Sequence, residues 1–513
     1  MTEPLPLNRL YLAHSHQELA AGAAPGEVFY LKSADGRSHI VRQNGAGLAQ
    51  ALTTEPAPSG GIGYGGGTFA VRDGLLAFAA RDDRLYGLDL DTGRQWPISP
   101  KCEGVAAPAF SPDGRLVAFL AEADGACNVL LAETNGEQLP VKLTRNPWYA
   151  FNPVFSPDGA RLAWTEWGRF DMPWDESRVV VARLACSASE AASAAQVLPL
   201  ELQALGQPRV SYASPQFSPD GRWLAYTSDE SGWRSLWVTP ADADDLRARA
   251  VRVDTGPGEI GMPDWVPGLF SMRWAPDSAA LFAIRRHQSR ASLVRVTWPD
   301  KTVTILESAY SWLHDLSIAG GQLAYLAGRS TCPEAVVTRD LHSGQETPRA
   351  TNQVGVLDEA ALVEPEVISW PTTDGATAWG LFFKGRAAAG QSEPRPLIVS
   401  VHGGPTSERG LTWDPQGQFF ATRGWHYLQL NHRGSTGFGR AYQSLLDGQW
   451  GVVDVEDARS GAQHIVDQGL ADPSQLVITG HSAGGYSTMQ ALTTDPDFWA
   501  AGIASAGIAN IYD

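Results

Sequence analysis

The sequence lacks any run approaching 18 consecutive apolar residues, so it predicts no helix that spans a membrane. Its start, MTEPLPLNRLYLAHSHQ, has no basic stretch followed by an apolar one, which argues against a secretory signal peptide. Basic residues are scarce, since 39 Lys and Arg stand against 56 Asp and Glu and leave a net charge of −17. We therefore expect neither nucleic acid nor an anionic membrane surface to be the main partner.

Cysteine is also rare. The four cysteines, Cys102, Cys127, Cys186 and Cys332, are far apart and match neither zinc-site nor disulfide-framework spacing. This usage favours a reduced, cytoplasmic compartment, and it predicts no metal site. Apolar residues make up 43% and charged residues 19% of the 513 residues, as in ordinary globular proteins. By length alone the chain would form about three domains.

A repeat fills the first two thirds of the chain. The segment Phe110–Phe119, FSPDGRLVAF, recurs in related form at Phe155–Trp164 and at Phe217–Tyr226. Four weaker copies lie at residues 26–31, 72–78, 274–284 and 320–325. In each copy a turn leads into a short apolar strand, and a second alternating strand follows. Asp-Gly supplies the turn geometry, and the β-branched and aromatic residues favour strands.

The repeated turn falls at residues 26, 74, 114, 159, 221, 278 and 321, with spacings between 40 and 62 residues. Several strands per period of this length are typical of β-propeller blades. The seven units predict a seven-bladed β-propeller over about residues 20–350, and we assign residues 1–355 to this domain. Two β-sandwiches are the alternative, and the repeated Ser-Pro-Asp-Gly argues against them.

The pattern changes after about residue 360, where strands alternate with helices. Residues 396–402 form a continuous apolar run, as expected of a strand buried on both faces. Apolar residues of 455–466 fall on one helical face, and strands are expected at 425–430, 475–479 and 500–505. Such alternation predicts a mostly parallel α/β sheet, so that residues 356–513 form the second domain.

The candidate chemistry lies at a turn of this second domain. Gly480-His-Ser-Ala-Gly484 matches G-x-S-x-G, between the strand ending at Thr479 and a helix expected at Ala483–Thr493. The pattern alone is weak, but this context puts Ser482 at the apex of a sharp turn, near a helix N-terminus that favours negative charge. A buried serine in a tight turn is the alternative. The N–H of Ala483 is a natural donor to a developing oxyanion.

A second oxyanion donor should come from a loop after an earlier strand. His402-Gly-Gly-Pro405 is such a loop, because it directly follows the apolar strand that ends at Val401. Glycines let the backbone approach a substrate oxygen closely. Alone this tetrapeptide predicts only a loop, but together with the serine turn about 80 residues later it indicates an acyl-transfer site.

These motifs resemble those of the prolyl oligopeptidase family of serine peptidases, and most closely its acylaminoacyl-peptidase and dipeptidyl-aminopeptidase-like members. The matching stretches are His402–Pro405, Asn431–Gly439, Val453–Asp457 and Gly480–Gly485. The blades are similar to the Ser-Pro-Asp-Gly blades of TolB-like and peptidase propellers. The resemblance therefore implies a propeller followed by an α/β-hydrolase domain.

The resemblance also implies roles for individual residues. Ser482 would be the nucleophile, and Ala483 and Gly404 would supply the oxyanion N–H groups. Glu166 and Glu230 are candidates for binding a free peptide amino terminus, although surface glutamates are more often solvated or in salt bridges. His432 is interpreted as a support residue. The implied substrates are short peptides, selected in size by the propeller, with no cofactor; self-association into a homo-oligomer stays open.

One part of such a site is missing from the sequence. A serine hydrolase of this fold carries its acid and its histidine after the serine, but no histidine follows Ser482. His402 and His481 are poor candidates for the base because each belongs to one of the two loops. We therefore expect the triad Asp and His beyond residue 513, in a longer protein, and expect the 513 residues alone to be inactive.

Two other functions stay open from the sequence. A carboxylesterase could use the same serine turn, but simple esterases carry no large propeller. A non-catalytic binding protein is the second, because propellers often only bind partners; the pairing of the serine turn with the glycine loop argues against it.

Overall fold

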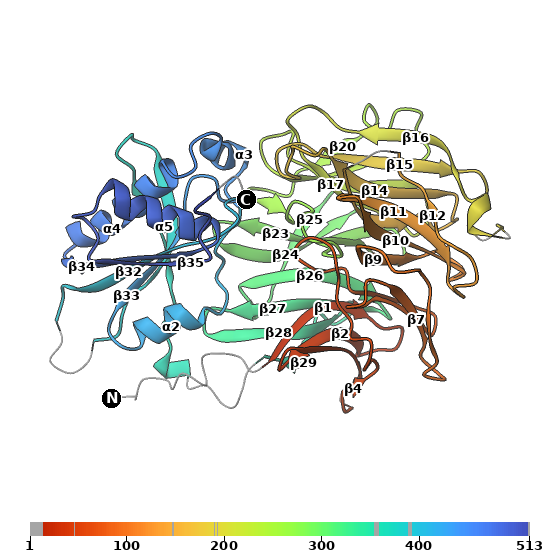
Figure 1. Cartoon of the computed structure of the whole chain (residues 1–513), viewed down its shortest axis with the longest axis horizontal. Coiled ribbons are helices and arrows are strands. Elements are labelled where there is room, and N and C mark those ends of the chain that lie inside the picture. Colours follow the sequence, from red (N-terminus) through yellow and green to blue (C-terminus); the bar gives the residue numbers. More distant parts are fainter. Residues whose placement is uncertain are drawn as a thin grey trace.

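The computed structural model describes residues 14–45, 47–145, 148–188, 190–191, 193–352, 359–387 and 392–510. Its N-terminal part is a ring of seven antiparallel sheets, and its C-terminal part is an α/β domain beside the ring (Figure 1). The sequence-based prediction of a seven-bladed propeller followed by an α/β-hydrolase domain is confirmed. Within the described residues, no helix has the length and apolar character needed to cross a membrane.

Each blade is built from strands that are consecutive in the chain. The first three blades comprise β1 (His14–Ala21), β2 (Glu27–Ala34), β3 (Arg37–Asn44) and β4 (Gln50–Ala51); β5 (Phe69–Arg72), β6 (Leu75–Ala79), β7 (Leu85–Asp89) and β8 (Gln95–Pro97); β9 (Gly104–Phe110), β10 (Leu116–Ala123), β11 (Ala126–Glu133) and β12 (Val141–Lys142). The next two comprise β13 (Tyr149–Phe155), β14 (Arg161–Trp167), β15 (Arg178–Leu184) and β16 (Pro199–Leu205); β17 (Tyr212–Phe217), β18 (Trp223–Ser228), β19 (Ser235–Pro240) and β20 (Val251–Val253). The last two comprise β21 (Glu259–Ile260), β22 (Met272–Trp274), β23 (Ala280–His287), β24 (Arg290–Thr297) and β25 (Val303–Leu306); β26 (Trp312–Ala319), β27 (Gln322–Arg329), β28 (Cys332–Asp340) and β29 (Glu346–Thr351).

The repeated turn leads into the second strand of every blade except the sixth, where it leads into β23, which pairs with both preceding strands. Its last residue has a positive φ in all seven copies, including Ser278 (φ 59°), which replaces glycine in the decayed repeat. In the clearest copy, Ser111 Oγ donates to Asp113 (2.7 Å) and accepts from the N–H of Leu116 (3.0 Å). Because a strand precedes each turn, the blades begin at His14 and end at Thr351, slightly wider than predicted.

Side chains of the last blade hold the first blade and close the ring. The N–H of Leu19 donates to Asp315 Oδ2 (2.9 Å), and the N–H of Ala21 donates to Ser317 Oγ (2.9 Å). The N–H of Gly26 donates to Gln322 Oε1 (2.9 Å). Polar contacts between complete blades thus join the two ends of the ring.

The second domain is a six-stranded mixed sheet in the order β30-β31-β33-β32-β34-β35. Its strands are β30 (Glu366–Pro371), β31 (Thr377–Phe383), β32 (Arg395–Val401), β33 (His426–Asn431), β34 (Ala471–His481) and β35 (Ala501–Ser505). The first two are antiparallel, and β33, β32, β34 and β35 are mutually parallel. The boundary that we predict between residues 355 and 356 lies outside the described residues.

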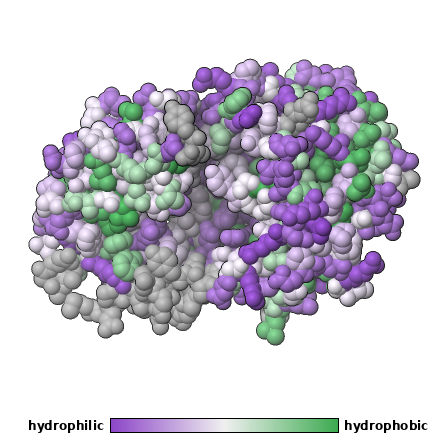
Figure 2. All heavy atoms as spheres, viewed as in Figure 1, coloured by the Kyte–Doolittle hydropathy of each residue, from purple (hydrophilic) through white to green (hydrophobic). Residues whose placement is uncertain are grey.

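Helices cover both faces of this sheet. α4 (Val453–Asp467) and α5 (Ala483–Thr494) lie on one face and α2 (Pro415–Ala421) on the other, while α3 (Arg440–Gln443) lies beside the propeller (Figure 1). Within the described residues β35 pairs only with β34, and Ile503 on it is 60% exposed. Figure 2 shows hydrophobic residues on the visible face of the α/β half, and further ones toward the outer edge of the propeller half, among hydrophilic residues.

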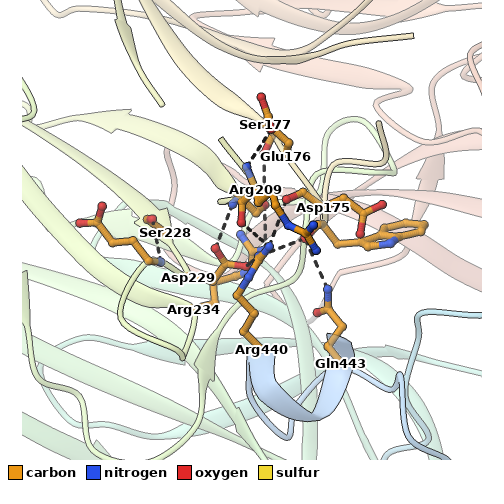
Figure 3. Close-up of polar contacts among 12 residues, drawn as sticks. Asp175, Glu176, Ser177, Arg209, Ser228, Asp229, Arg234, Arg440 and Gln443 are labelled. Carbon is orange, nitrogen blue, oxygen red and sulfur yellow. Dashed lines mark hydrogen bonds and ion pairs between the residues drawn. The ribbon is translucent and has the colours of Figure 1, made fainter. Parts of the chain in front are cut away.

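An arginine of α3 contacts the propeller and helps to hold the α/β domain in place against it (Figure 3). Arg440 Nη1 forms an ion pair with Asp229 (2.5 Å) on the fifth blade. The same guanidinium donates to the carbonyl oxygens of Trp174, Asp175 and Arg209. Bonds to a carboxylate and to several carbonyls define one orientation of a guanidinium, so this contact orients the loop that follows β33.

A buried ion pair forms the second contact between the domains. Arg286 Nη1 of β23 lies 3.0 Å from Glu408 Oε1, and both side chains are at most 4% exposed. Glu259 of β21 lies nearby and accepts the N–H groups of Gly437 (2.9 Å) and Gly439 (3.1 Å). Burial raises the pKa of Glu408 to about 7; Arg286 opposes this shift and the Glu259 carboxylate adds to it.

We expect this acid to make folding depend on pH. In the folded chain Glu408 keeps its proton up to about pH 7, whereas in the unfolded chain it loses it near the ordinary glutamate pKa. The unfolded state therefore binds fewer protons in between, and stability falls as pH rises from about 4.5 to 7, by up to about 3 kcal/mol. Urea unfolding at a series of pH values should show that the free energy of unfolding falls less steeply with rising pH in Glu408→Gln than in the parent. A Glu408→Gln profile as steep as that of the parent, or of the exposed-site control Glu366→Gln, would contradict the assignment.

Candidate active site

Ser482 lies at the turn between β34 and α5. Its backbone has φ 55° and ψ −120°, an unusual conformation for a residue other than glycine. The N–H of Ser482 donates to the carbonyl of Ser505 on β35 (2.9 Å), and its own carbonyl accepts from the N–H of Tyr486 (3.1 Å). The serine thus stands where the strand ends and the helix begins, in the strained turn expected from the sequence.

The glycines around Ser482 are required by close packing. A Cβ on Gly480 would lie 2.2 Å from the carbonyl oxygen of Gly484, and one on Gly484 would lie 2.3 Å from that of Val401. A Cβ on Gly485 would lie 2.8 Å from Gly507 Cα. Strand, helix and the segment after β35 approach too closely for any larger residue, which explains the G-x-S-x-G pattern at this place.

The loop His402–Pro405 lies against this turn. β32 and β34 are parallel neighbours with Val401 opposite Gly480, so both loops leave the same edge of the sheet. A Cβ on Gly403 would lie 3.4 Å from Ser482 Cβ. The predicted donors, the N–H groups of Ala483 and Gly404, belong to these two adjoining segments, and neither has an acceptor among the described residues. The structure therefore brings together the two motifs that the sequence separates by about 80 residues.

Ser482 Oγ has no hydrogen-bond partner within the described residues, and the nearby histidines are engaged elsewhere. His402 contacts the carbonyl of Gly403 through Nδ1 (2.8 Å) and Ser435 Oγ through Nε2 (2.9 Å). His481 Nδ1 lies 3.0 Å from Ser505 Oγ. These contacts agree with the expectation that neither histidine is the base.

His402 and His432 stack, with ring centroids 4.4 Å apart. Burial, and next the charge of His432, lower the pKa of His402 well below its usual value. Burial also lowers the pKa of His432, against the effect of Asp454. The two rings pack against each other at the start of the glycine loop, and a supporting role for His432 stays a prediction.

A buried ion-pair cluster beneath the loop after β33 was not predicted from the sequence. The N–H and Nε of Arg433 donate to Asp457 of α4 (2.7 and 2.8 Å), and its Nη1 donates to Asp374 (2.6 Å). Nη2 also contacts Glu456. One signal was present, since Asp457 on the expected helix has no basic residue three or four positions away. The cluster fixes the loop that carries His432 and Ser435.

The two candidate ligands of a peptide amino terminus already have protein partners. Glu166 of β14 accepts from Trp164 Nε1 (2.9 Å) and from Arg178 Nε (2.8 Å), at the edge of a cavity of about 390 Å³. Glu230 accepts from Gln207 Nε2 (2.7 Å) and from the hydroxyl of Tyr212 (2.6 Å). These bonds favour the structural interpretation of both carboxylates.

The tryptophans near Glu166 pack within the fourth blade. Trp164, Trp167 and Trp174 are buried, and Trp167 stacks on Tyr149 with centroids 5.4 Å apart. Trp148 is 37% exposed, and the guanidinium of Arg169 lies 4.7 Å from its ring. Most of the cluster is thus core, and Trp148 and Trp167 border the adjoining cavity.

Similarity to known proteins agrees with this geometry. Residues 412–513 match the model of the prolyl oligopeptidase family. The chain is 26% identical over 461 residues to the uncharacterized peptidase YuxL of Bacillus subtilis, covering 74% of this chain and 69% of the relative. It is 33% identical over 335 residues to the acylamino-acid-releasing enzyme of Arabidopsis thaliana, covering 58% of this chain and 44% of that enzyme.

Among solved structures, a puromycin-hydrolyzing peptidase of Mycobacterium tuberculosis superposes with a TM-score of 0.89 at 26% identity. The superposition covers 99% of this chain and 79% of that one. A puromycin hydrolase at 24% identity, with a TM-score of 0.86, shares the fold. The motifs around Ser482 and these similarities agree: residues 412–513 match the prolyl oligopeptidase family, and the whole chain is similar in fold to a puromycin-hydrolyzing peptidase.

Proposed function

We propose that the complete protein hydrolyses short peptides through an acyl-enzyme formed on Ser482. The observation that carries this proposal is the strained turn at Ser482, with an unpartnered hydroxyl beside the glycine loop. A nucleophile needs such freedom to approach a carbonyl carbon. The names of the relatives, which release acylated amino acids or hydrolyse puromycin, agree with substrates that carry an aminoacyl group.

The proposed reaction has two stages. Ser482 Oγ attacks the peptide carbonyl while a base removes its proton, and the N–H groups of Ala483 and Gly404 hold the oxyanion. The amine leaves with that proton, and water then attacks the acyl-enzyme and releases the acid. The N-terminus of α5 adds favourable electrostatics at the developing negative charge. His402, His432 and His481 are not the proposed base, because each is engaged in the contacts described above.

We further propose that the propeller limits the size of the substrate. It contacts the loops at the carboxyl edge of the α/β sheet through Glu259, Arg286 and Asp229. A substrate that reached Ser482 between these contacts would have to be a short, flexible chain. Glu166 and Glu230 stay proposals for binding a free amino terminus. A cytoplasmic location is proposed because the four cysteines, which all lie in the described part of the chain, form no disulfide.

A carboxylesterase remains the second candidate, because the same serine turn could attack an ester. Purified complete protein should be tested on aminoacyl p-nitroanilides with free and acetylated amino termini, on p-nitrophenyl esters, and on peptides of increasing length. We expect hydrolysis of anilides and short peptides, with kcat/KM falling steeply for long peptides and folded proteins. Turnover of esters alone would favour the esterase, and equal cleavage of long and short chains would contradict the size limit.

A further inference from the structure

The axis of the propeller holds a cavity of about 230 Å³. Every blade contributes residues to its wall, and no residue of the α/β domain lines it. Three polar residues of the wall lie on the innermost strands of the first, fourth and seventh blades: Glu18, Asn152 and Asp315. Each has a positive φ of 47–55°, at a bulge where the pairing register of its strand shifts. The bulges re-aim these side chains locally, as bulges near functional sites do.

Two loops separate this cavity from the α/β domain. Residues 60–68 and 261–270 meet so closely that a Cβ on Gly268 would lie 2.4 Å from Gly67 Cα. The carbonyl of Gly67 accepts from the N–H of Ala107 (2.6 Å), and the N–H of Gly268 donates to Asn152 Oδ1 (2.7 Å). Residues 262–266 and Leu269 also line a second cavity, of about 170 Å³, that includes Glu408 of the α/β domain. The axial cavity is thus distinct from the candidate active site, since Ser482 does not line it. Asp315 borders both the axial cavity and the second cavity that includes Glu408.

Unused donors gather on one side of the cavity. Asn152 is 1% exposed, and because its Oδ1 accepts from Gly268, its Nδ2 is the atom without a partner. Gln216 Nε2 of the fifth blade is also buried without a partner. Arg273 of the sixth blade makes one long hydrogen bond, to the carbonyl of Met272 (3.4 Å), and its guanidinium lies 3.7 Å from the Phe270 ring. Buried donors without acceptors are costly, which points to a ligand that accepts hydrogen bonds.

Arg273 is a cation without a close counter-ion. Within the described residues no carboxylate lies within ion-pair distance of its guanidinium. Burial lowers the pKa of Arg273 only to about 10, so it stays charged at neutral pH. A half-buried guanidinium with a single long hydrogen bond among the described residues is a ready partner for a carboxylate.

Two acids lie on the other side of the cavity. Glu18 of the first blade accepts from the N–H of Thr68 (2.5 Å) and from its hydroxyl (2.6 Å), and Asp315 of the seventh blade accepts from the N–H of Leu19 (2.9 Å). Blades one and seven are neighbours in the ring, and so are blades four, five and six. The wall therefore carries acceptors on blades seven and one and donors on blades four, five and six, and the two arcs adjoin where Arg273 and Asp315 interact electrostatically.

We propose that the axial cavity of the propeller binds a free α-amino acid as its zwitterion, with the carboxylate on Arg273, Asn152 and Gln216 and the ammonium on Glu18 and Asp315. A zwitterion satisfies both arcs and brings no net charge into a buried site, whereas a simple anion would face the two acids. The cavity holds the volume of several water molecules, enough for a small amino acid. The proposal does not depend on the peptidase reaction, although hydrolysis of peptides would supply such ligands.

Calorimetric titration of the complete protein with glycine, alanine and leucine tests the site. We expect saturable binding of glycine or alanine, weaker binding of acetate or methylammonium alone, and at least about tenfold weaker binding in Arg273→Met, which loses the charge-assisted bonds. Gln216→Leu, a milder change, should weaken binding several-fold. Arg285→Met removes a propeller arginine that donates to Thr255 outside this cavity and should bind normally.

Two further results would overturn the proposal. One is that the folded parent protein binds no amino acid. The other is that Arg273→Met and Gln216→Leu bind amino acids as tightly as the parent does. Acetate or inorganic phosphate binding as tightly as glycine would instead indicate a plain anion site and also contradict the zwitterion. Ser482→Ala should bind glycine as the parent does. Loss of binding in that variant would assign the ligand to the active site, so failure here is distinguishable from failure of the proposed function.

Discussion

Replacing Ser482 with alanine is expected to abolish hydrolysis of every substrate that the complete protein accepts. The loss should reach about 10⁴-fold or more, because removing the nucleophile of a serine hydrolase leaves only the contribution of binding and of the oxyanion donors. Covalent labelling by a fluorophosphonate should disappear together with turnover. Stability should change little, since Ser482 Oγ makes no hydrogen bond to the part of the chain that the structure describes.

Ser505→Ala is the matched control for this experiment. Ser505 lies at the end of β35, and its hydroxyl contacts His481 Nδ1 (3.0 Å) beside the same turn. It should keep both labelling and turnover within a few-fold of the parent. Labelling that survives Ser482→Ala and is lost in Ser505→Ala would contradict the assignment of the nucleophile. A parent protein that folds but is never labelled would favour a binding protein over an enzyme.

The propeller could be predicted because its repeated unit is local. Asp-Gly fixes a turn through the left-handed conformation of its glycine, and the same conformation persists at Ser278 where the glycine is lost. The first strand of each blade could not be predicted as readily, because it precedes the turn and varies in sequence. Its bulges at Asn152 and Asp315 depend on contacts with loops more than 40 residues away, such as that of Gly268 with Asn152.

The serine turn could be predicted for a similar reason. Glycines at positions 480 and 484 are required by contacts within the turn and with the neighbouring strand. The surroundings of the turn depend on partners that are distant in sequence. The local sequence does not predict the ion pair of Arg433 with Asp457 or the stacking of His402 on His432. It also does not predict that Glu408 pairs with Arg286 of the propeller. Glu166 is a candidate through the family resemblance, and the sequence could not show that Arg178 and Trp164 already hydrogen-bond to it.

Gly484→Ala is expected to destabilise the α/β domain and to impair Ser482 at the same time. Gly484 is inside α5 with no positive φ, so alanine alone would favour the helix by about 1 kcal/mol. The new Cβ would, however, lie 2.3 Å from the carbonyl of Val401, and either that strand or the helix must move. Overpacking of this kind costs about 1–3 kcal/mol. Because His402–Pro405 follows Val401 directly, the shift should also displace the candidate oxyanion donor.

Gly469→Ala separates this steric effect from a general intolerance of glycine replacement. Gly469 has a φ of 72°, and a Cβ there would meet nothing within 4 Å, so alanine should cost only about 1 kcal/mol through the left-handed backbone. Urea unfolding and the rate of fluorophosphonate labelling should be measured for both variants. We expect Gly469→Ala to be labelled at the parental rate and Gly484→Ala at least about tenfold more slowly, in line with the value of one oxyanion donor. Parental stability and labelling in Gly484→Ala would mean that β32 and α5 are farther apart than the structure has them, and the oxyanion site built on their contact would have to be abandoned.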